Sequence, residues 1–162
     1  MKKFITTVFL CAISVTASAK CTLRDFNGDW RVMMTLVPLE DPDGEAIAQR
    51  GGDLACTVRF DRRGQFVPVA DNRCQQSGLN YSFGQIRAGS VQQPVTLPAA
   101  KSCQFQITLD FDRDGSDQTQ TVTLANVYLD QAKIGFAADV DVAEPEDDVW
   151  HAGTAWGFKP AR

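Results

Sequence analysis

The sequence has almost none of the groups on which common enzyme mechanisms depend. His151 is its only histidine, and it contains neither an HExxH pair nor a nucleophile-elbow pattern. Its cysteines form no CxxC motif, and no cluster of histidine and cysteine has the spacing of a zinc site. These absences argue against metalloprotease, acyl-transfer and dithiol redox chemistry. The enzyme that remains open is a small hydrolase that would use carboxylates together with His151.

Long apolar runs and excess positive charge are missing as well. After the first nineteen residues, no apolar segment is long enough to span a membrane. Lys20 precedes Cys21, whereas the lipid-modified cysteine of a bacterial lipoprotein usually follows a small residue. Acidic residues outnumber basic ones by 20 to 16, so the chain lacks the basic surface that nucleic acids and anionic membranes require. The sequence therefore predicts a soluble protein that binds neither nucleic acid nor membrane.

What the sequence does contain begins with a secretion signal. Two lysines precede an apolar run from Phe4 to Val15, and an Ala-Ser-Ala trio ends at Ala19. We interpret residues 1–19 as a signal peptide and residues 20–162 as one domain, located in the periplasm of a Gram-negative bacterium or secreted. Cleavage removes two lysines and one cysteine, which leaves 14 basic residues (16 − 2), 20 acidic residues and four cysteines. The mature net charge is then −6 (14 − 20).

Alternating apolar and polar residues with a period of two indicate strands along most of the mature chain. The clearest run extends from Cys103 to Phe111, with an apolar residue at every second position. No window has a convincing helical period, and no repeat or linker divides the chain. We therefore predict an all-β domain, an antiparallel barrel of about eight strands, with a β-sandwich as the alternative. In the last expected strand, at 153–158, Trp156 and Phe158 are expected to face inward.

Four cysteines in an exported domain predict two disulfide bonds. Cys56 and Cys103 lie on apolar strand faces, and both are expected to point into the core. Cys74 follows an expected strand at 65–70, which returns from a turn and would bring Cys74 towards Cys56. We predict the pairs Cys56–Cys74 and Cys21–Cys103, although the spacing leaves the other pairings open.

A short acidic motif matches the first half of an EF-hand calcium loop. Asp110, Asp112 and Asp114 occupy alternate positions, and Gly115 follows at the sixth. The twelfth position, normally a glutamate, is Thr121, and the flanking segments are expected strands rather than helices. One interpretation is a calcium ion bound by Asp110, Asp112 and Asp114. The other is a hairpin turn beside strand aspartates that face solvent. No other cofactor is expected.

The densest charge on the chain lies just before His151, in one of two long polar connections. A solvated loop would account for it. The functional interpretation is an acidic surface that attracts a basic protein partner. Residues 41–50 and 143–151 would then make the contact. The candidate binding residues are Glu144, Glu146, Asp147, Asp148, Trp150 and His151.

The segment from Phe26 to Trp30 reads F-N-G-D-W and opens the first expected strand. Its Gly28-x-Trp30 pattern resembles the G-x-W motif that begins lipocalin barrels and their calycin relatives, which include avidins and small bacterial periplasmic protease inhibitors. The resemblance implies a barrel closed at one end by Trp30, under a basic residue late in the chain. Lys159 or Arg162 would fill this role. The middle motif of lipocalins is not recognisable here and their C-terminal helix is missing, so the resemblance indicates a barrel rather than a ligand.

Taken together, these features favour non-catalytic binding. In one hypothesis the barrel recognises another protein through its acidic loops, as an inhibitor or immunity factor would. In the alternative it carries a small apolar ligand in the barrel mouth, lined by Trp30, Met34, Phe105 and Phe136. The inward faces are rich in phenylalanine, leucine, isoleucine and valine, which tend to fill a small barrel completely. We therefore expect a protein partner, with a basic surface if the acidic loops make the contact.

Overall fold

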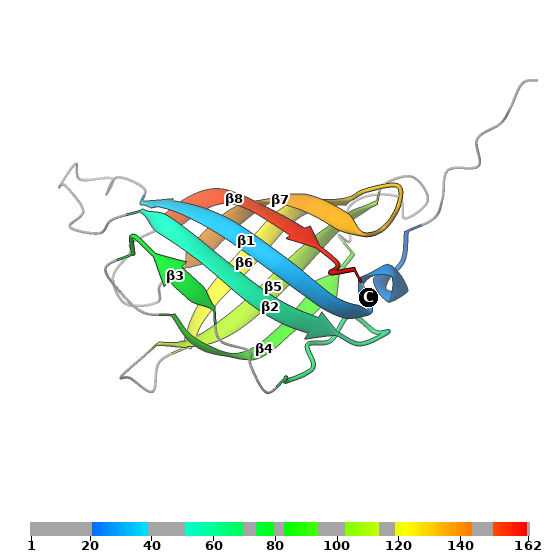
Figure 1. The fold of residues 1–162 in the computed structure, drawn as a ribbon, viewed down its shortest axis with the longest axis horizontal. Coiled ribbons are helices and arrows are strands. Elements are labelled where there is room, and N and C mark those ends of the chain that lie inside the picture. The colour runs from blue at the N-terminus through cyan, green and yellow to red at the C-terminus, as the bar shows by residue number, and fades with distance from the viewer. Residues whose placement is uncertain are drawn as a thin grey trace, which may run out of the picture.

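Eight strands form one antiparallel sheet in the computed structural model of this chain (Figure 1). Neighbouring strands pair in the order β3-β2-β1-β8-β7-β6-β5-β4. The structure describes residues 21–38, 51–69, 74–79, 83–93, 103–113, 119–143 and 151–161. The elements are a 3-10 helix, η1 (Leu23–Phe26), and the strands β1 (Gly28–Pro38), β2 (Gly52–Phe60), β3 (Gln75–Ser77), β4 (Phe83–Gln92), β5 (Gln104–Arg113), β6 (Thr119–Leu129), β7 (Gly135–Ala143) and β8 (His151–Phe158).

The sheet curls, and the segment that follows β2 joins one side of the curl to β4 (Figure 1). Phe66 forms an isolated bridge with Phe60 of β2, and its N–H donates to the Gly89 carbonyl oxygen of β4 at 3.0 Å. The Val91 N–H donates to the Gly64 carbonyl oxygen at 2.7 Å. Gly64 has a φ of +76°, and a Cβ there would lie 2.9 Å from the Val91 carbonyl oxygen, so this close approach requires glycine. The predicted antiparallel barrel is confirmed over the sandwich.

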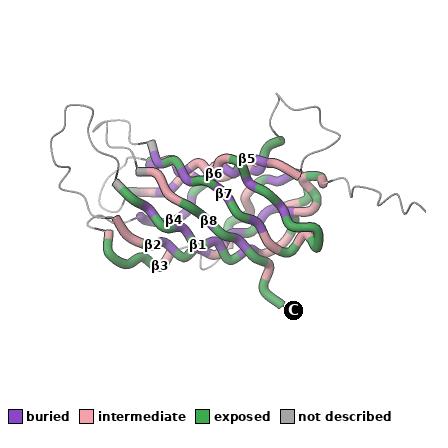
Figure 2. Tube along the Cα trace, turned by 90° about the horizontal axis from the view of Figure 1, so that it is seen from above, coloured by how far each residue is buried: buried purple, intermediate pink, exposed green. Residues whose placement is uncertain are grey.

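Alternate residues of each strand face the interior, which the alternating buried and exposed positions in Figure 2 make visible. Near the start of β1, the Trp30 ring centroid lies 5.3 Å from that of Phe136. Near the start of β4, Phe83 lies 5.1 Å from Phe111. Large apolar side chains therefore fill the barrel along its length. The largest fully buried ones are Trp30, Phe26, Phe60, Phe105, Phe111, Met34, Leu36, Leu54, Ile86, Ile107, Leu109 and Leu124.

The expected inward orientation of Trp156 and Phe158 is wrong. Their side chains are 51% and 47% exposed, and Ala155 and Gly157 take the inward positions of β8. The cause lies on β7, where Phe136 pairs with Gly157. A Cβ at Gly157 would collide with the Phe136 ring. Because that ring occupies the interior volume beside β8, only small residues fit inward on this strand.

Two segments depart from the simple alternation of apolar and polar residues. The alternation breaks between 119–124 and 127–129, yet both belong to one strand, β6. Its register with β7 shifts between Ala125 and Tyr128, where Asn126 has a φ of 50°. This local irregularity interrupts the alternation of apolar and polar residues. One continuous strand therefore has the sequence pattern of two separate strands. The expected strand at 65–70 makes only isolated bridges in its described part.

Candidate functional site

One end of the barrel is closed by η1, which the sequence analysis did not anticipate. Thr22 and Asp25 form a capping box in which the Thr22 N–H donates to the Asp25 carboxylate at 2.7 Å. The turn sends Phe26 into the barrel, where its ring centroid lies 5.5 Å from Trp30 and 4.8 Å from Phe105. The Trp30 indole N–H donates to the Phe26 carbonyl oxygen at 2.6 Å. The buried indole N–H is thereby satisfied and η1 acts as a plug.

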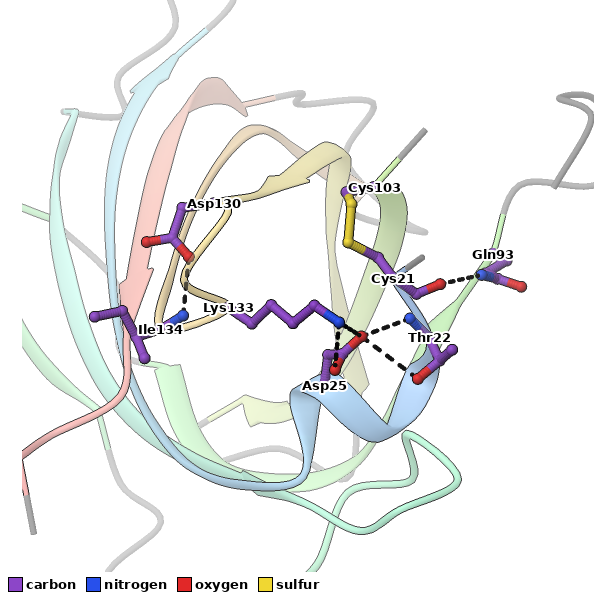
Figure 3. The surroundings of a disulfide bond; sticks show 8 residues. All are labelled: Cys21, Thr22, Asp25, Gln93, Cys103, Asp130, Lys133 and Ile134. Atoms are coloured by element: carbon purple, nitrogen blue, oxygen red, sulfur yellow. Dashed lines mark hydrogen bonds and ion pairs between the residues drawn. A yellow bond between two sulfur atoms is a disulfide. The ribbon is translucent and has the colours of Figure 1, made fainter. Parts of the chain in front are cut away.

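Two lysines fasten this plug to the far side of the barrel. Lys133, in the turn between β6 and β7, places its Nζ 3.0 Å from Asp25 Oδ2 (Figure 3). Lys159, directly after β8, donates from Nζ to the Asp25 carbonyl oxygen at 2.7 Å. Its Nζ also lies 5.0 Å from the centroid of the Trp30 ring, a cation–π distance. Lys159 therefore occupies the place over Trp30 that the calycin resemblance implied, whereas Arg162 lies outside the described residues.

The carboxyl group of Asp25 is held in its charged form. Burial alone would raise its pKa, but the Thr22 backbone N–H and the Lys133 ammonium donate hydrogen bonds to it. These bonds outweigh burial, so the pKa of Asp25 lies below its ordinary value. The Asp25 carboxyl group is therefore charged at neutral pH, and its ion pair with Lys133 holds η1 against the barrel.

Both predicted disulfide bonds are confirmed. Cys21–Cys103 joins the segment two residues before η1 to the residue that precedes β5, over a sequence separation of 82 residues (Figure 3). Cys56–Cys74 joins β2 to the residue before β3, over a separation of 18. The two bonds indicate an oxidising environment. With the Asp25 contacts, the first bond holds η1 over this end of the barrel.

The opposite end of the barrel is where two acidic segments leave the sheet. Val142 of β7 pairs with His151 of β8, and His151 pairs with Pro38 of β1. The strand ends that carry residues 39–50 and 144–150 are therefore neighbours. These two segments contain eight acidic residues and one basic residue. We refer to the two segments and the strand ends that carry them as the acidic loop end.

Most of the predicted binding residues lie in this part of the chain but beyond the described structure. His151 is placed by its backbone alone, at the start of β8. The acids that the structure does describe on the adjoining strand are Asp139 and Asp141, both exposed on β7. The acidic contact surface and the hydrolase that would use His151 therefore stay predictions. The predicted residues outside the described ranges are Glu144, Glu146, Asp147, Asp148 and Trp150.

Two of the three predicted calcium ligands make contacts within the sheet. Asp110 Oδ1 accepts a hydrogen bond from the Thr121 hydroxyl at 2.8 Å, and Asp112 forms an ion pair with Arg87. Asp114 lies outside the described residues. Within the ranges that the structure describes, no group of three or more His, Cys, Asp or Glu side chains could hold a metal ion. The calcium site stays a prediction from the sequence.

An apolar row crosses the outer face of the sheet, from strand to strand. Met33 of β1 pairs with Trp156 of β8, Trp156 pairs with Ala137 of β7, and Ala137 pairs with Tyr128 of β6. Met33 and Trp156 are each 51% exposed, and Tyr128 is 58% exposed. Phe158 lies two residues along β8 from Trp156 and is also exposed. We call these five residues the apolar face, and contiguous exposed apolar side chains of this kind are typical of an interaction surface.

Two hollows border the apolar face. The first has a volume of about 370 Å³ and includes Met33 and Phe158 in its lining. The second has a volume of about 220 Å³ and is lined in part by Tyr128, Ala137 and Trp156. This surface was not predicted from the sequence, because Trp156 and Phe158 were expected to face inward and instead face outward. The available signal was the alternation of small and aromatic residues from 153 to 158.

Comparison with known proteins adds no family to these observations, because neither a family model nor a curated protein matches the chain. Among the described residues, no helix has the length and apolar character needed to cross a membrane. The features of the molecule that bear on function are the filled barrel, its acidic loop end and its apolar face.

Proposed function

We propose that this chain is an exported, non-catalytic binding protein that recognises another protein through its acidic loop end. The proposed location is the periplasm of a Gram-negative bacterium or the secreted fraction, with residues 1–19 as the signal peptide. An inhibitor or immunity factor against a hydrolase is the proposed type. This type is in keeping with the resemblance of Gly28-x-Trp30 to the calycin relatives that include periplasmic protease inhibitors.

The observation that carries this proposal is the register of β7, β8 and β1 at His151. In this register the end of β1, which leads into residues 39–50, lies beside the start of β8 and the end of β7, which flank residues 144–150. Eight acids and one base are then attached to one end of a small domain. Such an arrangement produces a negative potential that speeds the approach of a basic partner and disfavours acidic ones.

The filled interior supports surface recognition over carriage of a small apolar ligand. Trp30, Met34 and Phe105, which would line the mouth in the carrier hypothesis, are at most 1% exposed. Phe136 is 6% exposed and packs on Trp30. A ligand would have to displace packed aromatic side chains, which costs several kcal/mol. Both hollows described above open on the outside of the barrel.

Neutralising the four acids of residues 144–148 as Gln or Asn is expected to slow association with a basic target about tenfold at low salt. The thermal midpoint should not change, because the substituted residues are solvating acids of a polar segment rather than apolar strand residues. A target is first identified by testing which members of a panel of secreted hydrolases, with high and low isoelectric points, this protein inhibits. Association rates are then measured by surface plasmon resonance at low and high ionic strength.

A two-site comparison supplies the control for net charge. Asp147→Asn with Asp148→Asn, and Gln92→Lys with Gln106→Lys, each change the net charge by the same amount. Gln92 and Gln106 are exposed on β4 and β5. Only the first pair should slow association. Equal slowing by both pairs, or an association rate insensitive to salt and to all these substitutions, would show that the acidic loop end does not guide recognition.

A further inference from the structure

We infer that a second copy of this chain docks on the apolar face, in a symmetric dimer centred on Trp156. This surface is on the barrel wall formed by β1, β8, β7 and β6, and it is distinct from the acidic loop end. The inference therefore goes beyond the proposed function and stands on different residues.

Two opposite charges lie diagonally on either side of Trp156. Arg31 of β1 pairs with Phe158, two residues after Trp156 on β8. Asp139 of β7 pairs with Thr154, two residues before Trp156. With strands about 4.8 Å apart and residues about 3.4 Å apart along a strand, each charged residue lies about 8 Å from Trp156, in opposite directions. Both side chains are exposed.

Neither charge is neutralised by an ion pair in the described part of the chain. The Arg31 guanidinium donates to the Thr57 hydroxyl at 2.7 Å, and Asp139 accepts a hydrogen bond from the Asn126 amide at 2.9 Å. The ion pairs among the described residues join other groups. Arg31 and Asp139 therefore each present an uncompensated charge beside the apolar face, where an external group of opposite charge would be favourable.

A two-fold axis through Trp156 makes these charges complementary. If the axis lies in the plane of the face, perpendicular to the Arg31–Asp139 diagonal, it exchanges the two positions. Arg31 of each copy then faces Asp139 of the other, and Trp156 packs against its counterpart. The two ion pairs form at once because the interface is isologous. A partner with one sign of charge would satisfy only one side of this face, so the pattern specifies a second copy.

The shape of the face agrees with the same symmetry. If the strands are laid out on a plane at their usual spacing, the two-fold rotation places Phe158 of one copy close to Ala137 of the other. Ala137 lines the hollow of about 220 Å³ that also includes Tyr128 and Trp156. An exposed aromatic side chain is therefore matched with a hollow beside a small residue. The dimer would bury the apolar side chains that the single copy leaves in water.

We expect a reversible dimer with a dissociation constant in the micromolar range. The face spans three interstrand spacings, about 14 Å, from Met33 to Tyr128. A face of this width offers less area than the roughly 800 Å² per partner that a standard interface buries. Tight permanent association is therefore not expected. Sedimentation of the purified, oxidised protein from about 5 to about 500 µM covers this range.

Substitutions in the face should weaken the dimer in a defined pattern. Trp156→Ser is expected to raise the dissociation constant at least about fiftyfold. Arg31→Asp and Asp139→Arg are each expected to raise it about tenfold, because like charges then face each other. The double variant should return to within about threefold of the unsubstituted protein, since both ion pairs re-form with reversed sign. Thermal denaturation checks that each variant is folded.

The control is Gln106→Asp, which adds a charge at an exposed position of β5 and should leave the dimer unchanged. A protein that stays monomeric at every concentration would overturn the inference. So would a dimer that withstands Trp156→Ser. A double charge variant that associates no better than the single variants would overturn the two-fold arrangement itself, and this test does not depend on the Trp156 variant.

Discussion

Replacing Trp30 by alanine is expected to lower the free energy of unfolding by about 4 kcal/mol. The Trp30 side chain is fully buried and its indole N–H donates to the Phe26 carbonyl oxygen at 2.6 Å. Its ring packs against Phe26 and Phe136, with centroids 5.5 and 5.3 Å away. Lys159 lies over the same ring. Alanine would leave a large cavity at the closed end, an unsatisfied carbonyl group and a lysine without its aromatic contact.

The matched control for this substitution is Trp156→Ala, which removes the same side chain from the outer face. Trp156 is 51% exposed, so its loss should change the free energy of unfolding by about 1 kcal/mol or less when measured at a concentration where the protein is monomeric. Urea denaturation followed by circular dichroism measures both variants, and the Trp30 variant should also melt about 10 to 15 °C lower. Similar losses at the two positions would contradict the assignment of Trp30 to the core and Trp156 to the surface.

Removing the Cys21–Cys103 disulfide is expected to lower the free energy of unfolding by about 4.5 kcal/mol. The bond spans a sequence separation of 82 residues, and the chain-entropy model gives about this value for a closed loop of that length. The same model gives about 3 kcal/mol for Cys56–Cys74, whose separation is 18. The bond also fixes Cys21, two residues before η1, so its loss should loosen the plug and the packing of Phe26 in the barrel.

The two paired alanine variants, Cys21→Ala with Cys103→Ala and Cys56→Ala with Cys74→Ala, allow this comparison in urea under otherwise identical conditions. Hydrogen exchange should show faster exchange at η1 in the first variant and unchanged exchange there in the second. A loss below about 1.5 kcal/mol for the Cys21–Cys103 variant, or equal exchange at η1 in both, would show that the bond does not stabilise the closed end.

The strands and one of the disulfide bonds could be predicted because they depend on residues that are close in the sequence. A period of two from Cys103 to Phe111 specifies a strand with one apolar side, and the structure buries Phe105, Ile107, Leu109 and Phe111. The pairing of Cys56 with Cys74 is also short-range, because the two lie 18 residues apart on neighbouring segments. Such features depend on few long-range contacts, and for that reason the sequence predicted them.

The features that sequence reasoning missed depend on what lies across the barrel. Nothing local to 153–158 shows which side of β8 is inward, because the choice is made by Phe136 of β7. The plug η1 is only four residues long and is held by Lys133 and Lys159, more than a hundred residues later. Its capping box, with Thr22 and Asp25 three residues apart, was the one local signal.

Of the two candidate surfaces, one could be predicted from the sequence and the other could not. The acidic residues of the acidic loop end lie in two short segments, and each cluster is visible in the sequence without the fold. The apolar face draws its residues from four strands and arises only when Met33, Trp156, Ala137 and Tyr128 come into register. No sequence window contains these residues together, and only the strand pairing reveals them.

The central claim is that the barrel is filled and that recognition takes place on its outside. Native mass spectrometry of the protein purified from its own compartment, without chelator or denaturant, tests this claim most directly. The account predicts the mass of the mature chain less four hydrogens for its two disulfides, alone or in whole multiples, with no retained small molecule. A stoichiometric apolar molecule that stays with the folded chain and is released on unfolding would contradict it.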